Sequence, residues 1–201
     1  MNPHSPEDQL RHPEGRIYAA LEKIGDLTRA MQWESAKLLG LSPLQVQVLL
    51  FLQGHPENMR KGSLLADEFA VSRPTVSDAL KSLEKKGLLS RKKDTVDTRS
   101  YLLELTPAGE STCRQLQAYP QPLLTQIAAM DEERQGLLLS NLLNLIEQMH
   151  QLGLVKTARM CFACANYQGD KLSDHYCKLL QRPLENEGLR TDCPEFEAPG
   201  A

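Results

Sequence analysis

Residues 71–109 constrain the fold of this chain most, because they place a short helix, a basic hairpin and a second helix start in close succession. The stretch reads VSRPTVSDALKSLEKKGLLSRKKDTVDTRSYLLELTPAG. Val76, Leu80 and Leu83 recur at helical spacing and predict one apolar face that packs on a core. Ser72 is a suitable N-cap and Gly87 a suitable C-terminal stop, so we expect a helix between them.

A basic hairpin is predicted from about residue 88 to residue 105. Asp residues in its tip favour turn conformations through local hydrogen bonds. Tyr101, Leu103 and Leu105 then alternate as one face of a strand. Arg99 follows the turn. A basic hairpin beside a DNA-reading helix is called a wing, and an Arg in it suits the negative potential of a DNA minor groove.

Four linked pieces of this stretch resemble the MarR family of bacterial transcription regulators, which are winged helix-turn-helix proteins. They are 72–77 (SRPTVS), 83–88 (LEKKGL), 97–99 (DTR) and 105–109 (LTPAG). The resemblance covers about residues 17–152 and implies a homodimer that reads a pseudo-palindromic, double-stranded DNA operator. It also implies a small-molecule or redox effector near the junction of the dimer and DNA-binding regions. The family's DNA-contacting wing residue and its acidic partner correspond to Arg99 and Asp97.

The candidate DNA-contacting side chains are short, polar or basic, so they suit base edges and phosphates. They are Ser72, Arg73, Pro74, Thr75, Ser77, Asp78, Lys81, Arg91, Lys92, Lys93 and Arg99. Residues 60–101 carry ten basic and six acidic side chains in a chain whose total charge is −3. This local excess favours one face that meets phosphates, with binding that weakens as salt rises. A solvated polar helix face and a solvated charged loop remain the alternatives.

Composition favours a soluble cytoplasmic protein, with 41% hydrophobic and 24% charged residues. The first fifteen residues lack the apolar segment of a signal peptide, and no stretch has the length and apolarity that a membrane span needs. We therefore expect no membrane partner and reduced thiols.

The fold class that we predict is mostly α with a small β-wing: a winged helix-turn-helix plus long dimerisation helices. Three regions are expected, namely a mobile leader (1–15), the DNA-binding and dimerisation domain (16–154) and a cysteine-rich metal-binding module (155–201). Further helices are predicted over about 17–39, 42–52, 61–70, from 106 to a break near the prolines at 120 and 122, and 131–152.

The last of these helices has a broad apolar face formed by Leu138, Leu139, Leu142, Leu143, Leu145, Ile146, Met149 and Leu152. Such a face needs more partners than one small winged domain offers, which favours a dimer. Paired recognition helices would then meet half-sites about one helical turn apart. The alternative is packing within one subunit.

The tail contains four of the five cysteines: Cys161, Cys164, Cys177 and Cys193. Two residues separate the first pair, twelve separate Cys164 from Cys177, and fifteen separate Cys177 from Cys193. Four soft ligands in a segment with little core of its own suit a closed tetrahedral Zn²⁺ site, whose binding energy would help the segment to fold.

Other roles for these thiols stay open. The four cysteines would also suit an iron–sulfur cluster, a redox switch or inert packing. His175, two residues before Cys177, is a further candidate ligand, although a solvated role is the commoner one. Cys113 is expected to be a small buried side chain, with a reactive sensor thiol as the alternative.

We expect a transcription regulator rather than an enzyme, with repression as the expected mode. Segments 12–14 and 55–57 (both HPE) with the Cys161–Cys164 pair resemble part of the zinc deaminase signature. Met160, however, replaces the expected Pro, and the intervening gap holds the winged helix. The other alternative is a metal- or thiol-dependent protein-interaction adapter, which would be favoured if the basic wing proved dispensable.

Overall fold

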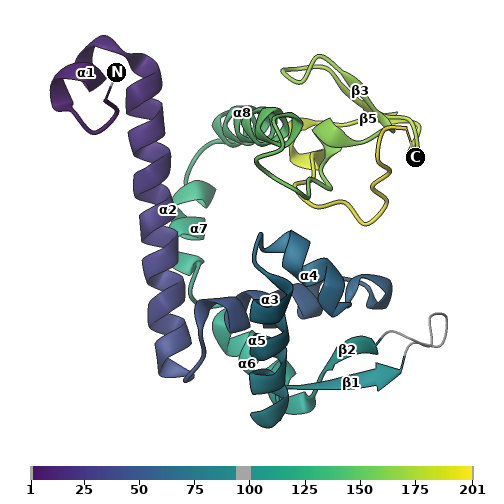
Figure 1. Cartoon of the computed structure of the whole chain (residues 1–201). Helices are drawn as coiled ribbons and strands as arrows, with labels where there is room; N and C mark the ends of the chain where they lie inside the picture. The colour runs from purple at the N-terminus through teal and green to yellow at the C-terminus, as the bar shows by residue number, and fades with distance from the viewer. Residues whose placement is uncertain (1, 94–100, 201) are drawn as a thin grey trace.

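The computed structural model describes residues 2–93 and 101–200 (Figure 1), over which the chain is mostly helical with a small wing, as predicted. The helices are α1 (Pro6–Arg11), α2 (Pro13–Leu38), α3 (Pro43–Gly54), α4 (Gly62–Glu68), α5 (Arg73–Lys85), α6 (Pro107–Leu116), α7 (Gln121–Ala128) and α8 (Glu132–Gln151). The strands are β1 (Leu89–Lys93), β2 (Tyr101–Leu105), β3 (Tyr167–Gly169), β4 (His175–Cys177) and β5 (Arg182–Pro183).

Side-chain caps begin four helices at the residues that the sequence predicts. Ser42 and Gln45 form a reciprocal capping box at the start of α3. Ser72, Thr106 and Asp131 each accept a hydrogen bond from the backbone N–H three residues further on, at 3.2, 3.1 and 2.9 Å. Local sequence therefore determines where α3, α5, α6 and α8 begin.

One apolar core joins α3, α4, α5, α6 and the β1–β2 hairpin into the winged helix. Leu49, Leu65 and Leu83 are fully buried in it. The hairpin and α6 meet closely, since a Cβ at Gly109 would lie 2.0 Å from the carbonyl oxygen of Leu88. Glycine is thus needed there for close approach of the two backbones.

Strand β2 departs in one respect from the predicted alternation. Leu103 is buried as expected, but Leu102 is buried too and Tyr101 is exposed. Strand β2 has backbone partners on both edges: β1 on one side, and the chain before α4 on the other. The backbone N–H of Leu103 donates to the carbonyl oxygen of Arg60 at 2.8 Å. The strand is thus an inner strand at this point, which is where side chains on both faces are often buried.

The N-terminal region is more helical than the predicted leader, because α1 occupies residues 6–11 and α2 already begins at Pro13. In Figure 1, α2 runs along one side of the molecule, with α1 folded back at its start and α3 at its end. Large apolar side chains on α2 are exposed over 38% to 86% of their surface, namely Ile17, Tyr18, Leu21, Ile24, Leu27, Trp33 and Leu38.

The residues after α8 pack as a small module against that helix (Figure 1). Strands β3, β4 and β5 form an antiparallel sheet, and a second apolar cluster includes Leu143, Met160 and Phe162. Leu143 is fully buried, whereas Leu145 and Ile146 on the same helix are exposed. The tail of the same chain therefore covers the part of the predicted apolar face of α8 around Leu143, while the part around Leu145 and Ile146 stays exposed.

Among the described residues, no single helix has the length and apolar character to cross a membrane. The pair α2 and α3, bent by 92°, meets the same criteria by length and composition only.

Candidate nucleic-acid interface and cysteine pocket

Helix α5 separates an apolar face from a polar one, as the sequence predicts. Val76, Leu80 and Leu83 are buried in the winged-helix core. The candidate DNA contacts on the helix and its cap are exposed, except for half-buried Ser77: Ser72, Arg73, Pro74, Thr75, Ser77, Asp78 and Lys81. The polar face is thus available while the opposite face anchors the helix.

The wing cations are held by carboxylates of the same domain. Arg91 Nε lies 2.9 Å from a carboxylate oxygen of Glu84, at the end of α5. Lys92 Nζ lies 3.2 Å from Glu104 and 3.5 Å from Glu57. The hydrogen bond from Lys92 to Glu104 and the charges of both carboxylates raise the pKa of Lys92. These pairs keep the two cations close to the hairpin.

Of the remaining wing candidates, the structure describes Lys93. Lys93 is exposed at the end of β1. Arg99 and Asp97 lie outside the described residues, so their predicted roles rest on the sequence alone.

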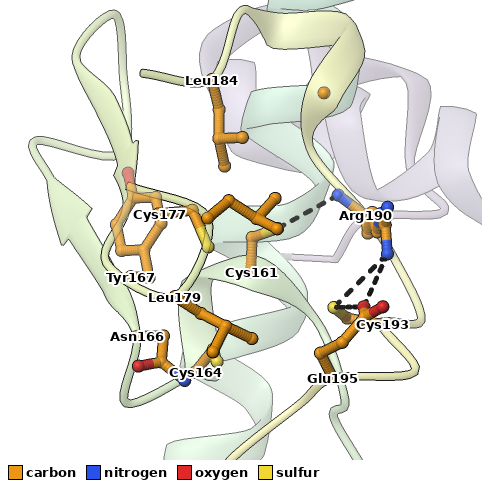
Figure 2. A pocket seen from close by; sticks show the side chains of 12 residues that line it. Cys161, Cys164, Asn166, Tyr167, Cys177, Leu179, Leu184, Arg190, Cys193 and Glu195 are labelled. Atoms are coloured by element: carbon orange, nitrogen blue, oxygen red, sulfur yellow. Dashed lines mark hydrogen bonds and ion pairs between the residues drawn. The ribbon is translucent and has the colours of Figure 1, made fainter. Parts of the chain in front are cut away.

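The four tail cysteines line one pocket (Figure 2). Cys161 and Cys164 stand at the two ends of a 3-10 turn, Cys177 ends β4, and Cys193 lies in the C-terminal loop. Figure 2 shows Cys164 and Cys177 on one side of the pocket and Cys193 on the other. Over the described part of the chain, no group of three or more His, Cys, Asp or Glu side chains is arranged to hold a metal ion. The four predicted ligands therefore share one pocket, and zinc binding stays a prediction.

Arg190 connects two of these cysteines. Its backbone N–H donates to Cys161 Sγ at 3.2 Å, while the N–H of Cys161 donates to the Arg190 carbonyl oxygen at 3.1 Å. The Arg190 guanidinium lies 3.8 Å from Cys193 Sγ and 2.8 Å from the Glu195 carboxylate. Burial raises the pKa of the Cys161 thiol above its ordinary value. The pocket thus presents N–H donors toward sulfur.

His175 has a structural role instead of the predicted solvated or metal-binding ones. It is 2% exposed. Its Nδ1 lies 2.8 Å from the Tyr167 hydroxyl and its Nε2 lies 3.0 Å from the Asn186 side-chain oxygen. Because both ring nitrogens have partners, the imidazole joins β3, β4 and the turn at residues 186–188.

Cys113 is fully buried in the winged-helix core, as expected. Its thiol lies 3.4 Å from the carbonyl oxygen of Leu49 and donates to it. Burial, with a smaller contribution from the charge of Glu110, raises the pKa of the thiol to about 11. A thiol that stays protonated is poorly nucleophilic, so the geometry disfavours the sensor alternative.

A polar junction that the sequence analysis did not predict joins the tail to the winged helix. The Arg159 guanidinium makes two hydrogen bonds to Asp192, each 3.0 Å, and lies 2.8 Å from Glu68 at the end of α4. Asp192 also lies 2.7 Å from Nε2 of His55, whose ring stacks on Phe51 at the end of α3. The sequence marks Arg159 and Asp192 only by their positions: Arg159 lies two residues before Cys161, and Asp192 lies one residue before Cys193.

The tail junction is formed by Arg159, Asp192, Glu68 and His55, and its one side chain with more than a third of its surface exposed is Asp192, at 38%. The Arg159 and Glu68 side chains are each 20% exposed. The pKa of Asp192 lies below its ordinary value, because hydrogen bonds from Arg159 and His55 outweigh burial, which acts in the opposite direction. The backbone N–H of Cys193 also donates to the Arg159 carbonyl oxygen at 2.6 Å. The tail junction is therefore joined to the cysteine pocket, by the peptide bond between Asp192 and Cys193 and by this hydrogen bond.

The packed core, the polar face of α5 and the β1–β2 wing define a winged helix-turn-helix domain. Residues 39–100 match the model of the MarR family, and this match confirms the resemblance to that family over the winged helix.

Solved structures share this fold. A mutant of S. aureus MepR from a multidrug resistant clinical isolate matches with a TM-score of 0.55 and 22% identity over 66% of this chain and 96% of MepR. The S. aureus MepR–DNA complex matches with a TM-score of 0.53 and 21% identity over 65% of this chain and 96% of that chain. A MarR transcriptional regulator from Methanosarcina mazei Go1 matches with a TM-score of 0.53 and 19% identity over 69% of this chain and 96% of that chain. No curated protein matches the chain.

Proposed function

We propose that this protein is a DNA-binding transcription regulator that acts in the cytoplasm and reads a double-stranded operator through α5 and the wing. The observation that carries the proposal is the exposed polar face of α5, whose opposite face is fixed in the core. An α-helix fits the major groove, and cations of a neighbouring hairpin reach phosphates. The fold is shared with a MepR–DNA complex, which supports the same use here. We infer repression as the mode, since occupation of an operator blocks access to it.

The regulator is proposed to act as a homodimer. The support is the amount of exposed apolar surface on long helices outside the winged core. Besides the α2 side chains given above, Leu124, Leu137, Leu138, Leu145 and Ile146 on α7 and α8 are exposed. Contiguous apolar surface of this kind marks an interaction site in soluble proteins. Two copies related by a two-fold axis would present two α5 helices to a pseudo-palindromic site.

Selection from a random library of duplex DNA tests the proposed reading. The full-length chain is expected to enrich two inverted half-sites whose centres lie about one helical turn, 34–36 Å, apart. The variant Arg73→Ala, changed in the first turn of α5, should lose at least tenfold in affinity for the enriched site. The matched control Arg29→Ala, on exposed α2, should bind like the parent. Recovery of unrelated sequences with equal affinity would reject the proposal.

Regulation is proposed to pass through the tail junction. Glu68 ends α4, the helix that precedes α5, and His55 follows α3. A change in the cysteine pocket that moves Arg159 or Asp192 would therefore alter the position of α4 relative to α8. Such a change regulates DNA binding only if the two arrangements differ in DNA affinity.

Alkylation of the tail cysteines tests this connection. We expect it to change the affinity of the wild-type protein for the selected DNA at least threefold. Arg159→Ala, which removes the contacts to Glu68 and Asp192, should make the affinity insensitive to alkylation. Arg182→Ala, at exposed β5, is the control and should respond like the wild type. A wild-type affinity that does not respond to alkylation would exclude regulation through the junction.

A small-molecule effector would have a site between α2 and α3. A surface pocket there is lined by Trp33, Pro43 and Gln47, among others. It connects the long helix to the winged domain, where a bound molecule would change their relative angle. The aromatic ring and neighbouring amides favour a flat, partly apolar ligand.

A further inference from the structure

We propose that the four tail cysteines hold an iron–sulfur cluster. The proposal goes beyond the DNA-binding function and rests on it only for the cluster's regulatory use. Cys161, Cys164, Cys177 and Cys193 all line the pocket of Figure 2. Four thiolates are the usual ligand set of [2Fe–2S] and [4Fe–4S] clusters.

The set of ligands is purely sulfur. His175 lies two residues before Cys177 in the sequence, but both of its ring nitrogens are hydrogen-bonded, one to Tyr167 and the other to Asn186. Glu195 lies in the pocket wall, but its carboxylate is paired with the Arg190 guanidinium at 2.8 Å. This leaves four thiols from three separate segments as the ligands.

The arrangement of the thiols suits a cluster, because all four cysteines line one pocket and come from three separate segments. A cluster places several iron and sulfide atoms between its ligands and so suits thiolates that line one pocket. Leu179, Leu180 and Leu184 supply apolar walls that shield such a centre from water.

The electrostatics of the pocket agree with this assignment. A cluster with four thiolate ligands carries net negative charge, which N–H donors to sulfur and nearby cations stabilise. The backbone N–H of Arg190 already donates to Cys161 Sγ at 3.2 Å, and its guanidinium lies 3.8 Å from Cys193 Sγ. Arg190 thus serves two of the four ligands from one residue.

The centre would also stabilise the module. Its apolar cluster contains few large side chains besides Met160, Phe162, Leu184 and Leu189 together with Leu143 of α8. A cluster would cross-link the 3-10 turn, β4 and the C-terminal loop. Metal binding then contributes folding free energy that this small core lacks.

Anaerobic purification of the full-length chain, followed by assay of iron, zinc and acid-labile sulfide, tests the proposal. We expect a brown protein with iron and sulfide in similar amounts per chain, restored after stripping by ferrous iron and sulfide. Cys161→Ala and Cys177→Ala should each lose most of the iron, while the control Cys113→Ala should keep it. Cys193→Ser leaves a hydroxyl ligand and should shift the visible spectrum even if the alanine variants fail to fold.

Two results would overturn the cluster. One is colourless protein with one zinc per chain and no sulfide. The other is protein that takes up neither iron with sulfide nor zinc, and whose tail still resists protease. Binding to the selected DNA is measured on the same samples. If the protein as purified, and after the attempt to load it, has no cluster but binds the selected DNA, the cluster proposal is rejected and the DNA-binding function stands. If the protein holds a cluster but shows no sequence-specific binding, the DNA-binding function is rejected and the cluster stands.

Discussion

Lys92 has surroundings that suit the proposed contact between the wing and DNA. Its ammonium is shared between Glu104 and Glu57, and all three side chains are more than a third exposed. Exposed ion pairs contribute only about 0–1 kcal/mol to stability, so phosphate oxygens can replace these carboxylates at small cost. The pairs therefore orient the cation without making it inaccessible.

The substitution Lys92→Ala tests this role. We expect weaker binding to all DNA sequences alike, because a phosphate contact carries no sequence information. The slope of the logarithm of affinity against the logarithm of salt concentration should fall by about 1. Titrations of duplex DNA by fluorescence anisotropy at several salt concentrations measure both effects. Lys23→Ala on α2 serves as the control, and an unchanged slope in both variants would show that the wing does not contact phosphate.

The buried thiol of Cys113 leads to a prediction about pH. Its pKa of about 11 means that the folded state disfavours the thiolate. Because the folded pKa is raised, the associated stability is present below about pH 9 and is lost as the pH rises toward 11. The free energy of unfolding should fall over that interval by up to about 2–3 kcal/mol, and less in Cys113→Ala. Denaturant titrations measure this, and a thiol reagent at neutral pH should label Cys113 only after unfolding.

At the scale of elements, the contact between α8 and the tail depends on one small residue. A Cβ at Gly136 would lie 2.7 Å from the Asn186 side chain, in the turn that also receives His175. The loop between β3 and β4 adds a second attachment, since Lys171 Nζ lies 3.0 Å from the buried carboxylate of Glu147 on α8. Helix α8 is therefore held by tertiary contacts along both its early and its later turns.

We expect Gly136→Ala to loosen the tail from α8, because overpacking of this kind costs about 1–3 kcal/mol. The readout is limited proteolysis, with faster cleavage after residue 155 while the winged helix stays resistant. Gly54→Ala is a matched control, since no atom lies within 4 Å of the added Cβ and alanine is the better helix former. Equal protection of both variants would mean that Asn186 moves aside without loss of docking.

At the scale of the whole molecule, the proposed dimer accounts for apolar surface that the single chain leaves exposed. Ile24 on α2 and Leu145 on α8 are 46% and 38% exposed. The double substitution to Glu should yield monomers and abolish specific DNA binding, because two reading helices are then no longer held at a set distance. Light scattering gives the mass, and Leu172→Glu on the exposed tail loop is the control. A wild-type monomer that binds its selected site tightly would contradict the dimer.

Much of the winged helix could be predicted because its signals are local. The N-caps Ser42, Ser72, Thr106 and Asp131 bond to residues three positions away. The apolar stripe of α5 repeats with the period of the helix itself. The four cysteines were expected to share a site, and they do line one pocket. The burial of Leu102 was not predicted, because it depends on tertiary packing; even the second backbone partner of β2, near Arg60, lies about forty residues earlier.

The winged helix follows from local signals, since caps, periodicity and turn residues act over a few positions of the chain. The attachment of the tail to it depends instead on contacts between distant residues. Arg159 meets Glu68 across 91 positions of sequence, and His55 meets Asp192 across 137. Such contacts have no local period or spacing, because they depend on how α8 and the tail module pack as bodies. For the same reason, the spacing of the cysteines does not predict the contacts of Arg190, which joins the segments of Cys161 and Cys193 in the folded chain.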